Sequence, residues 1–117
     1  MHPALKAYQA VAETSLSGRE AEAACFMMMI DELSLAERHK DQASRFKALD
    51  RHQKLWSMIM KANIVDGGQS AADDRELIVS LADKAQRYGI QAILESDLTL
   101  QPLIDIAQNV LDGLLAQ

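Results

Sequence analysis

An apolar stretch near the start of the chain, AACFMMMI at residues 23–30, holds four sulfur-bearing side chains and is the first candidate for chemistry. Successive residues of an α-helix turn by ~100°, so Met27, Met28 and Met29 fan over more than half the circumference and cannot close on one ion. Cys25 is the only cysteine of the sequence, which excludes an intrachain disulfide. Its apolar neighbours predict a buried, unreactive thiol.

Three histidines and a few polar motifs are the remaining candidates for catalysis. The histidines are His2, His39 and His52. They show neither the H-x-x-x-H nor the E-x-x-H spacing that is typical of metal ligands on a helix. Ser44 and Lys47 match S-x-x-K, but the S-D-N and K-T-G companions of that motif are missing. The DGGQS segment lacks the lysine and the spacing of a phosphate loop. We therefore predict a protein that is not an enzyme and has no metal and no cofactor.

Composition places these residues in a folded, helical protein. Apolar residues make up 49% of the chain and charged residues 25%, with only two prolines and five glycines. The longest apolar run has eight residues, far short of the ~20 that span a bilayer, and no signal peptide precedes the first helix. These features predict a cytoplasmic protein that does not enter a membrane.

The elements that must position the side chains are helices, and the fold class is all-α. We predict one domain, residues 1–117, that forms a single small bundle of about five helices. The second and third are long, and the last two follow a hinge at Gly67-Gly68. The predicted helices cover residues 3–13, 18–38, 40–63 and 72–95, and a fifth follows a cap at Thr99 with Pro102 in its first turn.

Three local features qualify this outline. Ser17 and Glu20 fit a capping box that starts the second helix. No glycine or proline separates the second helix from the third, so one long continuous helix remains an alternative. Gly89 lies within the fourth helix and predicts a kink or an early end there.

The second helix carries more apolar residues than one core-facing stripe needs. The stripe is predicted to hold Ala23, Phe26, Met27, Ile30 and Leu33, which leaves Cys25, Met28 and Met29 on other faces. Such a helix is either central in its bundle or in contact with a partner, and both readings remain open. Trp56, on the third helix, is favoured as a core anchor, although tryptophan is also a frequent interface anchor.

The charge is uneven along the chain. The whole sequence has a net charge of −5, but residues 38–61 hold seven Lys or Arg against two Asp. From Ile64 to the end, three basic residues face nine acidic ones. A basic third helix with an acidic second half suggests either electrostatic docking or charge complementarity within the molecule. Direct binding of nucleic acid is not favoured, because such runs are usually the solvated face of a helix.

Four motifs, in order along the chain, resemble the bacterial FlaF family of flagellar biosynthesis regulators. They are ALKAYQAV, SGREAEAACFM, ALDRHQKLWSMI and LIDIAQNVLDGL. The chain departs from the family pattern at His52, where asparagine is expected, and at Ala107-Gln108, where Asn-Arg is expected. If those positions contact a partner, the partner preference of this chain differs.

The resemblance implies a function in making and exporting flagellin. It implies a regulator that binds unassembled flagellin as a secretion chaperone and promotes flagellin synthesis and export. The partner would be flagellin, through its terminal helical segments, and the regulator FlbT is a further candidate. The alternative is a post-transcriptional regulator that acts on flagellin messenger RNA or through FlbT by its basic third helix.

Each of the two functions predicts its own set of binding residues. The flagellin-binding groove is predicted to hold Cys25, Met28, Met29, Leu55, Trp56, Ile59 and Met60. The alternative basic face is predicted to hold Arg38, Arg45, Arg51 and Lys54. The oligomeric state is left open by the sequence.

Overall fold

The computed structural model describes residues 18–65 and 72–116, and within these ranges every regular element is an α-helix. The helices are α2 (Gly18–His39), α3 (Gln42–Val65), α4 (Ala72–Leu94) and α5 (Gln101–Leu115). The all-α prediction is confirmed, with four described helices where about five were predicted. The first predicted helix, Ser17 of the capping box and the Gly67-Gly68 hinge lie outside the described residues.

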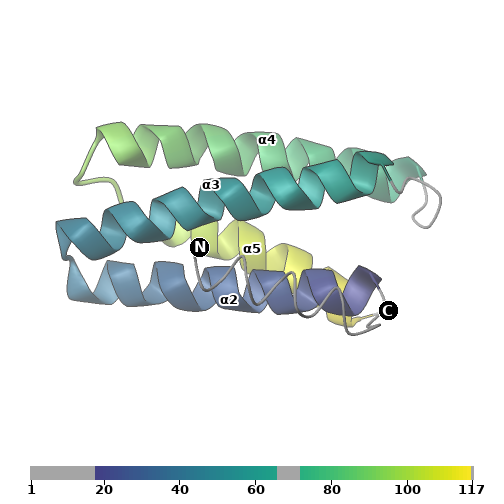
Figure 1. Cartoon of the computed structure of the whole chain (residues 1–117), viewed down its shortest axis with the longest axis horizontal. Coiled ribbons are helices and arrows are strands. Elements are labelled where there is room, and N and C mark those ends of the chain that lie inside the picture. Colours follow the sequence, from purple (N-terminus) through teal and green to yellow (C-terminus); the bar gives the residue numbers. More distant parts are fainter. Residues whose placement is uncertain (1–17, 66–71, 117) are drawn as a thin grey trace.

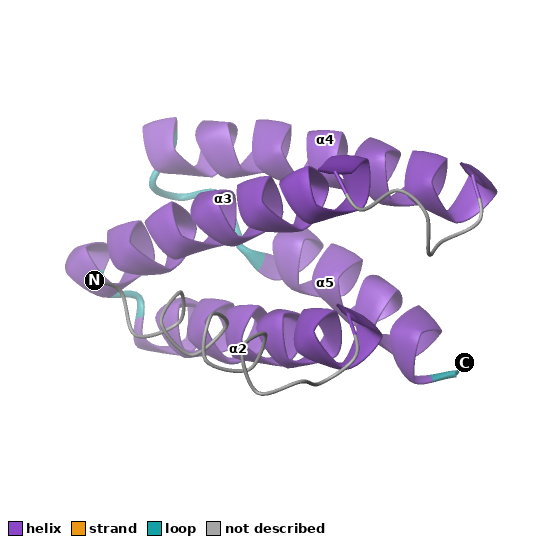
Figure 2. Ribbon diagram, turned by 45° about the vertical axis from the view of Figure 1, so that its right-hand side comes forward, coloured by secondary structure: helices purple, strands orange, loops and turns teal. Residues whose placement is uncertain are grey.

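The four helices form a bundle in which each packs against the next and α5 returns to α2 (Figures 1 and 2). In the described part of the chain, the backbone of α2 does not come close to that of α4, nor that of α3 to that of α5, so these pairs lie diagonally across the bundle. Neighbouring helices connected by short loops run antiparallel, which is the up-down-up-down arrangement of a four-helix bundle.

A sharp break separates α2 from α3, and the alternative of one continuous helix is wrong. Lys40 adopts a left-handed backbone conformation with φ of 52°, and its amide donates to the carbonyl of Ala36 at 3.0 Å. Asp41 then caps the start of α3. Its Oδ2 accepts hydrogen bonds from the amide of Ser44 at 3.0 Å and from the Ser44 hydroxyl at 2.8 Å. The break thus needs neither glycine nor proline.

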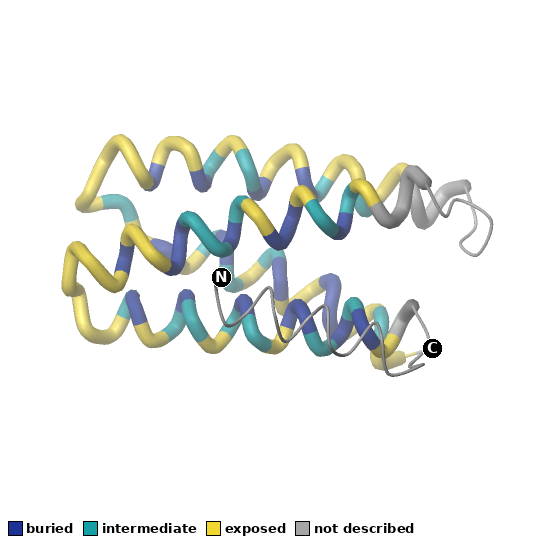
Figure 3. Tube along the Cα trace, viewed as in Figure 1, coloured by how far each residue is buried: buried dark blue, intermediate teal, exposed yellow. Residues whose placement is uncertain are grey.

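Figure 3 shows where the buried residues lie along each helix, and the side chains at these positions differ in size from helix to helix. Large core side chains come from α2, α3 and α5, among them Phe26, Trp56 and Leu103. The fully buried positions of α4 are small: Ala82, Ala85, Gly89 and Ala92. Because small residues leave little between two backbones, α4 can lie close to α3.

Gly89 leaves room for a side chain of α3 against the backbone of α4. A Cβ atom at Gly89 would collide with the side chain of Gln53 on α3. Gln53 is held there, because its amide nitrogen donates to the carbonyl of Gln86 at 3.0 Å. The helix continues past Gly89 to Leu94, so the predicted early end at this glycine is wrong.

The start of α5 confirms Pro102 in the first turn and corrects the cap. The residue at the cap position is Leu100 rather than Thr99. The Thr99 hydroxyl nevertheless accepts a hydrogen bond from the amide of Gln101 at 3.1 Å, which satisfies the first amide of the helix.

We expect Lys40→Gly to stabilise the protein. A left-handed conformation costs a non-glycine residue about 1 kcal/mol, which glycine avoids. The midpoint of thermal unfolding should therefore rise by a few degrees. The control Lys47→Gly, in the interior of α3, should lower stability by about 1 kcal/mol. A fall in the midpoint for Lys40→Gly would show that the left-handed residue carries no strain.

Candidate partner-binding surface

Most of the residues predicted to line a flagellin groove lie inside the bundle. Cys25, Leu55, Trp56 and Ile59 are 0% exposed and Met29 is 2% exposed. Only Met28 and Met60 are partly buried and reach the surface. The expectation that all seven form an open groove is therefore corrected, because five of them hold the helices together.

The apolar stretch of α2 is divided between core and surface. Met29 is in the core, Met28 is half-buried and Met27 is 44% exposed. The predicted stripe placed Met27 inside, and this is wrong, whereas Phe26 and Leu33 are buried as predicted. The physical reason is that α2 packs against both α3 and α5, so its buried face is wide and includes Cys25.

The core contact between α2 and α3 is aromatic. The rings of Phe26 and Trp56 meet edge to face, with centroids 5.1 Å apart and an angle of 71° between their planes. This geometry is one of the preferred arrangements of an aromatic pair. Trp56 is thus the core anchor that the sequence favoured.

Cys25 is unreactive in this environment. Burial, with a smaller contribution from the nearby charge of Glu22, raises the pKa of the Cys25 thiol to about 12. Thiolate is the nucleophilic form of cysteine, so almost none is present at neutral pH. The predicted buried, inert thiol is confirmed.

His52 is a polar residue in the core of α3. It is 1% exposed, and its Nδ1 lies 2.6 Å from Oε1 of Gln53. Oε1 can only accept, so Nδ1 carries the proton of the neutral ring. Among the described residues, Nε2 of His52 and Nε1 of Trp56 have no hydrogen-bond partner. Burial lowers the pKa of His52 to about 4, against the opposing effect of the Gln53 hydrogen bond.

The four residues of the predicted basic face do not share one surface. Arg45 is buried, and its Nη2 donates to the carbonyls of Ala92 at 3.0 Å and Glu95 at 3.2 Å, at the end of α4. Arg51 pairs with Glu32 at 3.0 Å. Lys54 pairs with Asp50 at 3.0 Å and is exposed, as is Arg38. The predicted basic face is therefore corrected. Arg45 caps the carboxyl end of α4 and is not available to a partner.

The other hydrogen bonds at this end of the bundle connect its loops. Glu37 of α2 accepts from the Thr99 hydroxyl at 2.6 Å and from the Leu100 amide at 3.2 Å. Burial opposes ionisation of Glu37, but these two hydrogen bonds and the nearby charges of Lys40 and Arg45 together outweigh it and lower the pKa of the carboxyl. The Tyr88 hydroxyl donates to the Thr99 carbonyl at 2.6 Å. The loop before α5 is thereby fixed to both α2 and α4.

The bundle leaves outside a set of large apolar side chains that the sequence motifs did not indicate as a surface. Nine large ones are exposed in the described residues: Met27, Leu35, Phe46, Leu77, Val79, Ile90, Ile93, Leu94 and Leu115. Five of the nine lie on α4, whose buried positions are small. The available signal in the sequence is that Ile93 and Leu94 lie three and four residues after Ile90.

In the described ranges, no group of three or more His, Cys, Asp or Glu side chains could hold a metal ion. No helix in residues 18–65 and 72–116 has the length and apolar character needed to cross a bilayer.

Two substitutions separate core from surface in the methionine run. Met29→Ala should lower the free energy of unfolding by about 2–5 kcal/mol, because it leaves a cavity in the core of the bundle. Met27→Ala should change it by less than about 0.5 kcal/mol. Urea unfolding followed by circular dichroism measures both. Equal effects of the two substitutions would contradict the assigned orientation of α2.

Protonation of His52 should destabilise the fold below neutral pH. In the unfolded chain, His52 takes up a proton with the ordinary pKa of 6.5, whereas in the folded protein its pKa is about 4. The free energy of unfolding should therefore fall as pH drops from 6.5, by about 2 kcal/mol at pH 5 relative to pH 7. His52→Gln should lack this dependence, and the exposed control His39→Gln should keep it. Parallel pH profiles for the two variants would refute the assignment.

The family comparison agrees with the motifs of the sequence. A family model described as "Flagellar protein FlaF" matches residues 4–114. No curated protein and no solved structure matches the chain. The matched range contains α2, α3 and α4 entirely and α5 to within its last residue. The chain belongs to the FlaF family of flagellar proteins.

Proposed function

We propose that this protein binds unassembled flagellin as a cytoplasmic secretion chaperone, and that it promotes flagellin synthesis and export by doing so. Membership of a flagellar protein family supports the flagellar part of the proposal. The observation that carries the chaperone part is the set of large apolar side chains that the bundle leaves exposed, most of them on α4. A second macromolecule would remove that apolar surface from water.

The terminal segments of flagellin are suitable occupants. Segments that become amphipathic helices only on assembly need a cover for their apolar faces before export. A helical bundle can provide the cover by packing an incoming helix along its surface, with anchors every three or four residues. The buried residues Cys25, Met29, Leu55, Trp56 and Ile59 would then support the binding surface from within the core.

The alternative is control of flagellin messenger RNA, directly or through FlbT, by the basic third helix. It has less support, because Arg45 is buried and Arg51 is engaged with Glu32. Binding through phosphates would also weaken steeply with salt, whereas apolar contacts would not.

A calorimetric titration against purified monomeric flagellin, at about 50 and about 500 mM salt, tests the proposal. We expect a dissociation constant in the micromolar range or below that changes by less than about tenfold with salt. Flagellin without its terminal segments is the control and should not bind. Absence of binding by the folded protein would refute the proposal, and a loss of several orders of magnitude with salt would favour the alternative.

A further inference from the structure

Two polar side chains of α3 are sealed inside the apolar core. His52 is 1% exposed and Trp56 is 0% exposed, and they lie four residues apart, which is about one turn of the helix. Among the described residues, neither Nε2 of His52 nor Nε1 of Trp56 has a hydrogen-bond partner, so the two atoms do not bond to each other. Buried polar atoms in native proteins are nearly always hydrogen-bonded, and two unpaired atoms on one face of a helix suggest a shared partner.

His52 presents an acceptor at Nε2. The side-chain nitrogen of Gln53 donates to the carbonyl of Gln86 at 3.0 Å, so the oxygen Oε1 is the atom that lies 2.6 Å from Nδ1 of His52. Because Oε1 can only accept, Nδ1 carries the proton of the neutral ring and Nε2 has a free lone pair. Nε2 therefore needs a donor.

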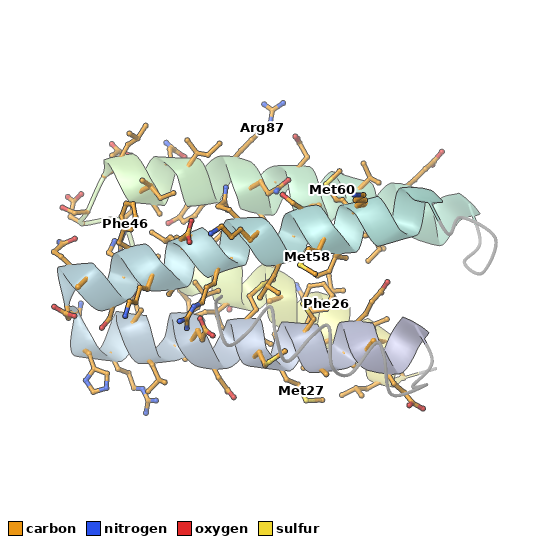
Figure 4. The ribbon with its side chains drawn as sticks, in the orientation of Figure 1. Phe26, Met27, Phe46, Met58, Met60 and Arg87 are labelled. Carbon is orange, nitrogen blue, oxygen red and sulfur yellow. The ribbon has the colours of Figure 1, made fainter. Side chains whose placement is uncertain are left out.

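Trp56 presents a donor at Nε1, since an indole nitrogen can only donate. The Phe26 ring fixes the indole by its edge contact, with the two centroids 5.1 Å apart. Figure 4 shows Phe26 on the side of α2 that faces α3, whereas Met27 lies on the side turned away. Phe26 has no polar atom to offer, so the indole N–H needs an acceptor from elsewhere.

We propose that one water molecule is bound in the core between these two side chains. It accepts the hydrogen bond of Trp56 Nε1 and donates one to His52 Nε2. Ordered buried water typically bonds to polar groups that the protein itself leaves unsatisfied. The chemistry of the pair selects water, because a cation could not accept from the indole and a simple anion could not donate to the imidazole.

The bridge would complete a chain of hydrogen bonds from the core to the surface. From the indole it passes through the water and His52 to Gln53, which is bonded to Gln86 of α4. Gln86 Nε2 in turn donates to the exposed hydroxyl of Ser57 at 3.0 Å. The orientation of the buried imidazole would thus be fixed from both ends, by the water at Nε2 and by Gln53 at Nδ1. This inference does not depend on which partner the protein binds.

Nuclear magnetic resonance tests the water directly. Trp56 is the only tryptophan of the chain, so its indole N–H signal is assigned without ambiguity. In the wild-type protein, the rotating-frame Overhauser spectrum should show a cross-peak between this proton and water, with the sign of a dipolar contact rather than of exchange. His52→Leu should abolish the cross-peak, whereas the core control Leu103→Val should keep it. No cross-peak in the wild type, or one that survives His52→Leu, would overturn the proposal.

The imidazole provides an independent readout. Its nitrogen-15 spectrum should show a protonated Nδ1 and a hydrogen-bonded Nε2 at neutral pH. Trp56→Phe should move the Nε2 resonance of His52 towards that of a free acceptor, because the water loses one of its partners. The signals of the exposed His39 should not move. A proton on Nε2 in the wild-type protein would contradict the assigned bridge.

A double-mutant cycle measures the coupling through urea unfolding. His52→Leu and Trp56→Phe should each raise the equilibrium constant of unfolding, because each leaves one buried polar atom without its partner. The double variant leaves neither atom behind, so its effect should be at least about fivefold smaller than the product of the single effects. The control cycle of Trp56→Phe with His39→Leu should be multiplicative. Multiplicative effects in the main cycle would refute the bridge.

Discussion

The small size of the buried positions of α4 is the constraint on which the rest of the bundle depends. The fully buried positions of that helix carry only alanine and glycine, and Gly89 leaves space for the Gln53 side chain of α3. Since α4 has no bulky residue at those positions, the large core side chains must come from the other helices. The edge contact of Phe26 with Trp56 is the centre of that contribution.

The same constraint explains the surface. The larger apolar residues of α4 do not occupy its buried positions. Some of them, such as Ile90 and Leu94, are exposed to solvent. The chain is thus a small helical domain of a flagellar protein family, and its own helices leave several large apolar side chains uncovered.

Much of the fold could be predicted from the sequence, because helix formers, a glycine pair and Pro102 are local signals. The break at Lys40 was not resolved in advance, since a lysine in the left-handed conformation has no signature and Asp41 resembles any surface acid. The orientation of α2 was partly misjudged, because a helix with two packing neighbours buries more than one stripe. Arg45 was read as a surface charge because its carbonyl partners lie 47 and 50 residues further along the chain.

Hydrogen bonds between side chains and distant backbone gather at the end of the bundle where α2 finishes and α5 begins. Glu37 holds the loop before α5, Tyr88 holds the same loop from α4, and Arg45 closes the last turn of α4. Each bond joins segments that meet only after the helices have assembled. Amide hydrogens at this end should therefore exchange with solvent only through concerted opening of several helices, so that this end behaves as one cooperative unit.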